Sequence, residues 1–409
     1  MRCRHCDFDL TEPFIDLGSA PPSNAYLSRE ALARPEKWYP LRVYVCSKCW
    51  LVQTEDFAGR GELFDSHYAY FSSYSTTWLA HAEAYVGKMA ARFSLSTESV
   101  VVEIAANDGY LLQYVKARGI PCYGVEPTAS TAAAAKNRNL DIIEEFFGVQ
   151  LARRLTVAGR PADLMVANNV LAHVPDINDF VTGFALLLKP NGVATFEFPH
   201  ALNLIEKRQF DTIYHEHYSY LSLLAVEGVF KTNGLRIFDV EEIPTHGGSL
   251  RIFAQRADTG KHAVLDRLDA LRKKELQAGI CSRSFYADFQ KKAVRIKNDL
   301  LAFLIDAGQK GRKVAAYGAA AKGNTLLNYA GVRPDLLPYV ADKSPAKQGQ
   351  WLPGSRIPIV SEDHLRNNRP DDILILPWNI RDEILEQLAY ARAWGARFVI
   401  AVPKLELIE

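Results

Sequence analysis

The sequence contains no uninterrupted apolar run of the length that crosses a bilayer, which is about 20 residues. Its first six residues, Met1–Cys6, carry arginines and cysteines in place of the apolar core of a signal peptide. These two absences argue against a membrane protein and against a secreted one. We therefore expect a cytoplasmic protein, in which thiols stay reduced.

An excess of charge of either sign is also missing, because 48 Lys and Arg residues face 47 Asp and Glu residues. This balance gives no overall electrostatic attraction to nucleic acid or to an anionic membrane. The hydrophobic content of 48% and the charged content of 23% are typical of a globular protein, and 409 residues suffice for two or three separate cores. We expect a monomer that binds neither nucleic acid nor membrane.

Cysteine is scarce, with six residues, yet four of them form two Cys-x-x-Cys pairs, Cys3 with Cys6 and Cys46 with Cys49. Each pair places two thiolates on one tight turn, and two such turns complete a tetrahedral zinc site. Four cysteine ligands leave no open coordination position, so the pattern predicts a structural zinc ion. Two independent reduced pairs are the alternative, and His5 is a less favoured substitute ligand.

The arrangement of apolar residues divides the chain into three regions, 1–75, 76–260 and 261–409. The first is rich in aromatics, proline and cysteine. The second alternates β-branched runs with helical stretches, as in an α/β sheet, and the third begins with a helical stretch and repeats that pattern. The candidate strands are Val100–Ile104, Cys122–Glu126, Asp163–Ala167, Gly192–Glu197, Lys313–Gly318, Leu337–Asp342, Asp372–Leu376 and Arg397–Ala401.

A cofactor pocket is expected where the first strands of the middle region end, because ligands of open parallel sheets gather there. Candidate residues follow three of these strands: Glu103, Ala105, Asn107, Asp108 and Gly109 after the first, Glu126 and Phe146 or Phe147 after the second, and Asn168 after the third. A carboxylate such as Glu126 suits a ribose diol. The Gly-x-Gly-x-x-Gly motif that a dinucleotide's pyrophosphate requires is missing from the turn. The pocket therefore favours S-adenosylmethionine, which has no phosphate, over NAD.

A second ligand site is predicted at Tyr317–Asn324, where a strand leads into a helix. Backbone N–H groups at such a helix start accept phosphate, and Lys322 adds a positive charge. The other candidate substrate-binding residues are Asn324, Lys347, Tyr68, Tyr70, Ser72 and Ser73. A small-residue turn needed only for helix packing remains the alternative for this segment.

The segment Phe210–Tyr220 concentrates two histidines, a glutamate and three tyrosines. Such a cluster can take a proton from carbon and stabilise the resulting oxyanion, and histidine suits the base because its pKa lies near neutrality. For His246, a place in the pocket and a structural role both stay open.

Taken together, these motifs resemble the C-methyltransferases of nucleotide-linked 4-keto-6-deoxysugars, typified by the tetronitrose C-3-methyltransferase. The resemblance covers essentially the whole chain, with Ala105 where glycine is frequent and His215 where the family pattern can carry Asp. It is carried by the two cysteine pairs, Tyr68–Ser73, Glu103–Gly109, Gly124–Pro127, Asn168–His173, Tyr214–His217, His246–Gly248, Tyr317–Lys322 and Asp342–Lys347.

The resemblance implies an α/β protein with an N-terminal zinc-binding domain, a central class I methyltransferase domain and a C-terminal Rossmann-like domain that holds a nucleotide-sugar. It implies His217 as the base and Tyr214 as its assistant, with Glu216 orienting the sugar and His173 contributing from the opposite wall. The expected reaction is methyl transfer from S-adenosylmethionine to a carbon beside a ketone, with C-3 favoured over C-5. An O-methyltransferase, a nicotinamide oxidoreductase and a non-catalytic zinc-containing scaffold are the alternatives.

Overall fold

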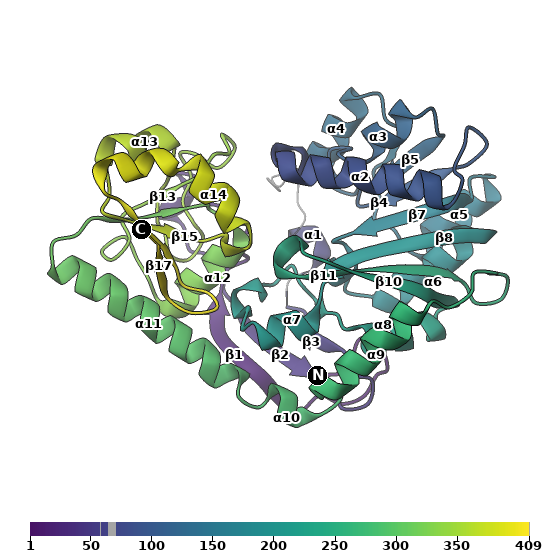
Figure 1. Ribbon diagram of the computed structural model, residues 1–409, viewed down its shortest axis with the longest axis horizontal. Coiled ribbons are helices and arrows are strands. Elements are labelled where there is room, and N and C mark those ends of the chain that lie inside the picture. Colours follow the sequence, from purple (N-terminus) through teal and green to yellow (C-terminus); the bar gives the residue numbers. More distant parts are fainter. Residues whose placement is uncertain (58, 64–70, 409) are drawn as a thin grey trace.

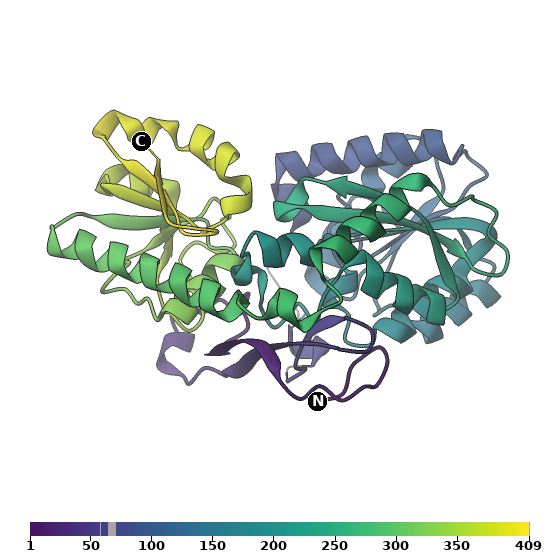
Figure 2. The same cartoon turned by 60° about the horizontal axis from the view of Figure 1, so that its bottom comes forward.

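The computed structural model describes residues 1–57, 59–63 and 71–408. Two α/β lobes lie side by side, and the N-terminal strands lie beneath the junction between them (Figures 1 and 2). Every helix within these residues is too short or too polar to cross a bilayer.

The N-terminal sheet joins strands from two distant parts of the chain. Its order is β1 (Pro13–Ala20), β2 (Tyr39–Val45), β3 (Val52–Thr54) and β9 (Ser219–Tyr220), all antiparallel. Alternate residues of β1, such as Ile15 and Leu17, are buried, as the two-residue period of a half-buried strand requires. Because β9 directly follows His217, this sheet fixes one end of the segment that carries the candidate base.

The central sheet has the order β10-β11-β8-β7-β4-β5-β6, in which β11 runs antiparallel to both of its neighbours. Its strands are β4 (Val101–Ile104), β5 (Cys122–Val125), β6 (Ile142–Ile143), β7 (Ala162–Asn168), β8 (Leu188–Pro199), β10 (Leu235–Ile243) and β11 (Ser249–Arg256). The parallel strands are nearly continuous apolar runs, because helices cover both faces of such a sheet. These helices are α2 (Thr76–Arg92), α3 (Leu112–Ala117), α4 (Ala129–Asn137), α5 (Val149–Val157), α6 (Ile177–Leu187) and α8 (Leu223–Thr232).

The helical stretch expected at the start of the third region forms α9 (Asp266–Ala278), α10 (Arg283–Tyr286) and α11 (Phe289–Gln309). A left-handed glycine, Gly279 at φ 83°, ends α9, as is common for a residue that needs no Cβ. The long α11 runs along the lower edge of the C-terminal lobe (Figure 1). It buries one stripe of residues, which includes Ile296, Leu300 and Leu304.

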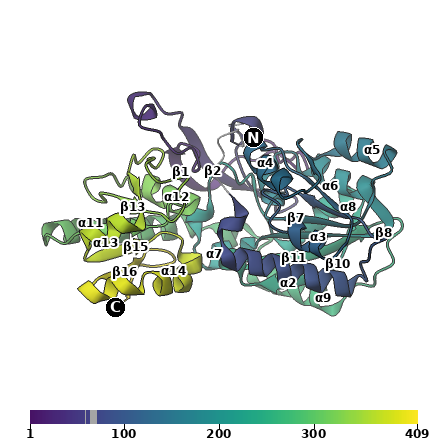
Figure 3. The same ribbon diagram turned by 90° about the horizontal axis from the view of Figure 1, so that it is seen from above.

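The third sheet has the order β14-β13-β12-β15-β16-β17 and is parallel except for its last strand. Its strands are β12 (Val314–Tyr317), β13 (Val340–Ala341), β14 (Ile359–Val360), β15 (Asp372–Ile375), β16 (Arg397–Ile400) and β17 (Glu406–Ile408), with helices α12 (Ala321–Ala330), α13 (Glu362–Asn368) and α14 (Arg381–Gln387). Seen from above, this sheet and the central sheet occupy opposite halves of the molecule (Figure 3).

Both larger sheets contain a point at which the strand order reverses: between β4 and β7 in one, and between β12 and β15 in the other. Ligands of open α/β sheets bind at such points. Ligands are therefore expected to bind at the loops that follow these strands.

Candidate active site between the two larger sheets

The four paired cysteines gather into one cluster, with all four Sγ atoms within 4.8 Å of one another. Cys3 Sγ lies 3.6 Å from Cys49 Sγ, and Cys6 Sγ lies 3.5 Å from Cys46 Sγ. A zinc–sulfur bond of about 2.3 Å places tetrahedral sulfurs about 3.8 Å apart, so the thiols fit a zinc ion.

The groups around the cluster complete this structural zinc site. Gln53 Nε2 donates a hydrogen bond to Cys3 Sγ at 3.2 Å, and such a contact orients a thiolate that binds metal. His5 is engaged elsewhere, because its Nδ1 lies 2.9 Å from Asn178 Oδ1.

A cavity of about 390 Å³ lies between the two larger sheets, within the size range of small-molecule sites. Its walls come from the ends of β4, β5 and β7, the loop after β15, the start of α12 and the segment that follows η4 (Phe210–Thr212). Both reversal points of strand order thus open into one space.

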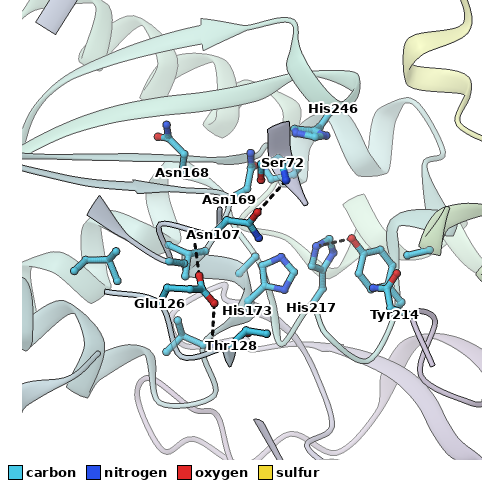
Figure 4. A pocket seen from close by; sticks show the side chains of 18 of the residues that line it. Ser72, Asn107, Glu126, Thr128, Asn168, Asn169, His173, Tyr214, His217 and His246 are labelled. Atoms are coloured by element: carbon cyan, nitrogen blue, oxygen red, sulfur yellow. Dashed lines mark hydrogen bonds between the residues drawn. The ribbon is translucent and has the colours of Figure 1, made fainter. Parts of the chain in front are cut away.

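Glu126 lines one half of this cavity, beside the ends of β4 and β5 (Figure 4). Its Oε2 accepts a hydrogen bond from the Asn107 backbone N–H at 2.9 Å, and its Oε1 accepts one from the Thr128 backbone N–H at 2.9 Å. Burial raises the pKa of the Glu126 carboxyl. These contacts fix the orientation of the carboxylate, whose remaining lone pairs suit the two hydroxyl donors of a ribose diol.

Unused polar atoms line the same half of the cavity. Both amide atoms of Asn168 and Oδ1 of Asn169 are buried without a hydrogen-bond partner among the described residues. The rings of Phe146 and Phe147 also line it, with Phe147 packed edge-on against Phe180. Orphaned polar groups beside flat apolar walls suit a ligand that combines an aromatic base with charged and polar groups, as S-adenosylmethionine does.

The turn after β4 contributes through its backbone shape. Ala105 and Asn107 line the cavity, and both adopt left-handed φ values, 58° and 50°. Ala105 occupies the position where glycine is frequent, and its positive φ explains that preference.

Three other predicted cofactor residues of this turn lie outside the set of described residues that line the cavity. Glu103 is fully buried in β4, and burial raises its pKa well above the ordinary value. Asp108 faces the Ser73 backbone N–H at 3.3 Å. Gly109, at φ 79°, packs so closely on Leu140 that an added Cβ would clash. These residues stabilise the loop on the side that faces away from the cavity.

His217 and Tyr214 lie together on the cavity wall (Figure 4), and their Nε2 and hydroxyl oxygen are 2.8 Å apart. His217 Nδ1 lies 2.9 Å from the Thr212 carbonyl oxygen. Since a carbonyl only accepts, Nδ1 carries the hydrogen and Nε2 keeps a lone pair directed at Tyr214. Burial, with a smaller contribution from the neighbouring His173 ring, holds the pKa of His217 well below its usual value, so the ring is neutral.

His173 packs edge-on against His217, with ring centroids 4.6 Å apart, and also lines the cavity. Burial lowers the pKa of His173 to about 4. Glu216 is buried behind this wall, where its Oε1 accepts hydrogen bonds at 3.2 Å from the backbone and the side chain of Asn24. Its carboxylate is thus linked to the cavity through the lining residue Asn24.

The other half of the cavity combines the start of α12 with two lysines. Ala320, Ala321, Lys322 and Lys347 line the cavity. Lys322 Nζ donates to Asn379 Oδ1 at 3.1 Å, and burial lowers its pKa to about 8.

The remaining predicted substrate residues are placed less uniformly. Ser72 lines the cavity, Ser73 bonds Asp108 and Arg138 beside it, and Asn324 is buried inside α12. Tyr68 and Tyr70 lie outside the described residues.

The cavity also contains residues that the sequence did not single out, among them Asn24, Trp78 and Asn379. Asn379 follows β15, so the rule that ligands gather at strand ends could have found it. Asn24 and Trp78 come from distant segments, and no local pattern marks them.

Three family models match consecutive parts of the chain. They describe a putative zinc binding domain at residues 3–64, a methyltransferase domain at 78–240 and a C-methyltransferase C-terminal domain at 244–403. The chain is 32% identical to the C-methyltransferase NovU of Streptomyces niveus over 406 residues, which is 99% of this chain and 96% of that protein.

Solved structures match about half of the chain. Magnesium protoporphyrin IX methyltransferase of Synechocystis PCC 6803, with bound SAM, is 16% identical, with a TM-score of 0.34, over 44% of this chain and 79% of that one. The 1,6-didemethyltoxoflavin-N1-methyltransferase of Burkholderia thailandensis is 15% identical, with a TM-score of 0.36, over 51% of this chain and 96% of that one.

Proposed function

This chain belongs to the C-methyltransferase family, and we propose that it methylates a ring carbon of a nucleoside-diphosphate 4-keto-6-deoxysugar, at C-3. Such a product belongs to branched-chain deoxysugar biosynthesis. The proposal includes the division of labour expected from the sequence: a zinc-binding region to about residue 75, a methyl-donor region to about 260, and a nucleotide-sugar region beyond it.

The observation that carries the proposal is the neutral His217 ring. Its lone pair at Nε2 is directed at the hydroxyl of Tyr214, another residue of the cavity wall, because the Thr212 carbonyl holds the hydrogen on Nδ1. A carbon beside a ketone loses a proton only when a base is positioned for it. In the proposed reaction the proton moves from the ring carbon to His217, directly or through Tyr214, and the electron pair forms the enolate.

The methyl donor fits the half of the cavity that Glu126 lines. When bound, S-adenosylmethionine supplies a methyl group already activated by its sulfonium. Glu126 would hold the ribose, while Asn168 and Asn169 would hydrogen-bond the donor's remaining polar groups. The rings of Phe146 and Phe147 would flank the face of the adenine.

The acceptor's diphosphate fits the other half. Among the described residues no side chain caps the first backbone N–H groups of α12, and Lys322 and Lys347 lie beside them. A nucleotide-sugar anchored there would extend its sugar ring toward His217 and the methyl donor.

Incubation of the enzyme with S-adenosylmethionine and a panel of 4-keto-6-deoxy nucleotide-sugars tests the proposal. Mass spectrometry should show a gain of one methyl group, and NMR should place it on C-3. In deuterated water the C-3 hydrogen of the sugar substrate should exchange with solvent. Methylation on oxygen, without exchange, would instead identify a sugar O-methyltransferase.

Substitution of His217 tests its assignment as the base in the same assay. His217→Asn should lower turnover by at least about 100-fold, since base catalysis typically contributes that much. His364→Phe, a change of an exposed histidine on α13, should leave turnover unaltered. Activity of His217→Asn within about tenfold of the unmodified enzyme would contradict the assignment.

A further inference from the structure

His246 lines the cavity from η5 (Thr245–Gly247), in the loop between β10 and β11, and the proposed chemistry gives it no role (Figure 4). Within the described part of the chain no group hydrogen-bonds its ring nitrogens. Its ring contact is with Trp78, edge-on at 5.2 Å between centroids. The imidazole thus presents unused hydrogen-bonding capacity to the ligand space.

The backbone at His246 is held in an uncommon conformation, with φ 53° and ψ 27°. Non-glycine residues rarely adopt this left-handed region, and they keep it only where the surroundings over-determine it. Such positions cluster at ligand-binding and catalytic sites, which makes the loop a candidate for function.

A closed ring of contacts fixes this loop from the side of the central sheet. Trp78 stacks on His81 with 4.8 Å between ring centroids, and His81 Nε2 lies 3.0 Å from Glu197 Oε2. Glu197 Oε1 in turn accepts a hydrogen bond from Thr245 Oγ1 at 3.1 Å. The ring therefore begins and ends at neighbouring residues, Thr245 and His246.

The other side of the loop rests on the catalytic segment and the C-terminal lobe. Gln209 Nε2 donates to the Gly247 carbonyl at 3.0 Å. A Cβ on Gly247 would lie 2.7 Å from atoms of Gln209 and Trp378, so only glycine fits there. His246 consequently has little freedom to leave the cavity.

The charges around His246 define what kind of donor it is. Burial lowers its pKa to about 4, and the nearby Lys322 charge acts in the same direction. The ring is therefore neutral near pH 7 and carries one N–H. A neutral imidazole suits an oxygen that gains charge during the reaction better than it suits a diphosphate, which the lysines already serve.

We propose that His246 donates its N–H to the keto oxygen of the acceptor and stabilises the enolate, an inference that rests on the proposed function. With the diphosphate at Lys322 and the base at His217, the sugar ring lies between them, and His246 faces that same space. As the proton leaves carbon for His217, the negative charge moves to the keto oxygen, which accepts the His246 hydrogen bond.

The test measures hydrogen exchange at the sugar carbon in deuterated water, with S-adenosylhomocysteine in place of the methyl donor. His246→Phe should slow exchange by about 100-fold, the loss typical for one oxyanion donor. His246→Gln, which restores an N–H donor, should recover at least about tenfold of that loss. Nucleoside-diphosphate affinity, measured by calorimetry, should stay within about threefold, and His364→Phe should change neither quantity.

Each alternative outcome has a defined meaning. Exchange by His246→Phe within about fivefold of the unmodified enzyme overturns the inference, as does a loss of nucleotide affinity equal to the loss of exchange. If His246→Phe does not fold, His246→Asn, which suits the same backbone but has a shorter reach, should show the same slowing. If the unmodified enzyme exchanges no hydrogen with any 4-keto sugar, the proposed function fails and this inference fails with it.

Discussion

At His217 one backbone carbonyl determines which nitrogen can act as a base. The Thr212 carbonyl oxygen, 2.9 Å from Nδ1, holds the hydrogen there, so the lone pair of Nε2 faces Tyr214. A base that is already neutral needs no prior loss of a proton. The local backbone of η4 thus performs the orienting role that a carboxylate performs in many catalytic triads.

This arrangement predicts how activity depends on pH. Burial, with smaller contributions from the neighbouring His173, Lys322 and His246 side chains, holds the pKa of His217 well below 6.5, while the hydrogen bond to Thr212 opposes the shift. The ring must be neutral to accept a proton, so activity falls only when the pH drops through that lowered pKa. We expect the acid limb of kcat/KM to lie clearly below pH 6.5, as a rate profile from pH 5 to 8 would measure. An acid limb centred above 6.5 would contradict the assignment of His217.

Most of the residues that the sequence nominated for the cofactor pocket line the cavity, although the sequence does not show which side chains face it. Glu126, Asn107 and Asn168 could be found because polar side chains that follow parallel strands converge at one sheet edge. Glu103 and Asp108 satisfy the same rule, yet they lie behind the loop. The left-handed turns at Ala105 and Asn107 decide which side chains face the cavity, and such φ values are not encoded in a strand-and-turn pattern.

At the scale of elements, the zinc site and the candidate base are joined through one sheet. The cysteine turn Cys46–Cys49 connects β2 to β3, and β3 pairs with β9, the strand that directly follows His217. Thr54 Oγ1 also donates to the His217 carbonyl at 3.0 Å. A zinc ion held by these cysteines would therefore stabilise the strand that pairs with β9, beside the segment that carries the candidate base.

Removal of zinc should consequently affect both stability and turnover. Structural zinc sites contribute several kcal/mol to folding, so a strong chelator should lower the unfolding midpoint by about 10 °C or more. Cys46→Ser should reproduce this loss, while Cys281→Ser, outside the cluster, should shift the midpoint by less than about 3 °C. Differential scanning fluorimetry with zinc quantification measures both effects. A chelated protein that contains no zinc and melts at the original temperature would exclude a structural role.

The sequence predicted most parallel strands but missed β9 and the antiparallel pairing of β10 with β11. A long apolar run such as β7 can be recognised as a strand from its composition. A two-residue strand such as β9 has no periodicity to detect, and its place depends on β3, more than 160 residues away in the sequence. Elements defined by distant pairing are therefore visible only in the folded chain.

At the scale of the whole molecule, the placement of the two α/β lobes creates the site. Trp378 Nε1 donates to buried Asp211 at 2.6 Å, and Thr325 Oγ1 donates to the Ile213 carbonyl at 2.9 Å. Both contacts tie the C-terminal lobe to the segment that carries His217. No local sequence pattern predicts these contacts, because each joins residues more than 100 positions apart.

This placement leads to a prediction for the acceptor half alone. Lys322 is half-buried beside Asp211 and Asn379, with its ammonium over the Trp378 ring, and desolvation lowers its pKa to about 8. A diphosphate attracts the charged form of the lysine, so nucleotide affinity should fall as the pH rises through 8. Calorimetry with a nucleoside diphosphate and no methyl donor, at pH 7 and pH 9, measures this dependence.

The matched variants separate a specific anion site from general electrostatic attraction. Lys322→Ala should weaken nucleotide binding by at least about tenfold at pH 7, because hydrogen bonds to charged groups are worth about 1.5–3 kcal/mol. It should also flatten the change in affinity between pH 7 and 9. Lys310→Ala, which removes an exposed charge at the end of α11, should alter neither value, since its partner Asp306 is exposed as well. Equal binding by Lys322→Ala and the unmodified protein would place the diphosphate elsewhere, and the sugar ring could then no longer be assigned to the space between Lys322 and His217.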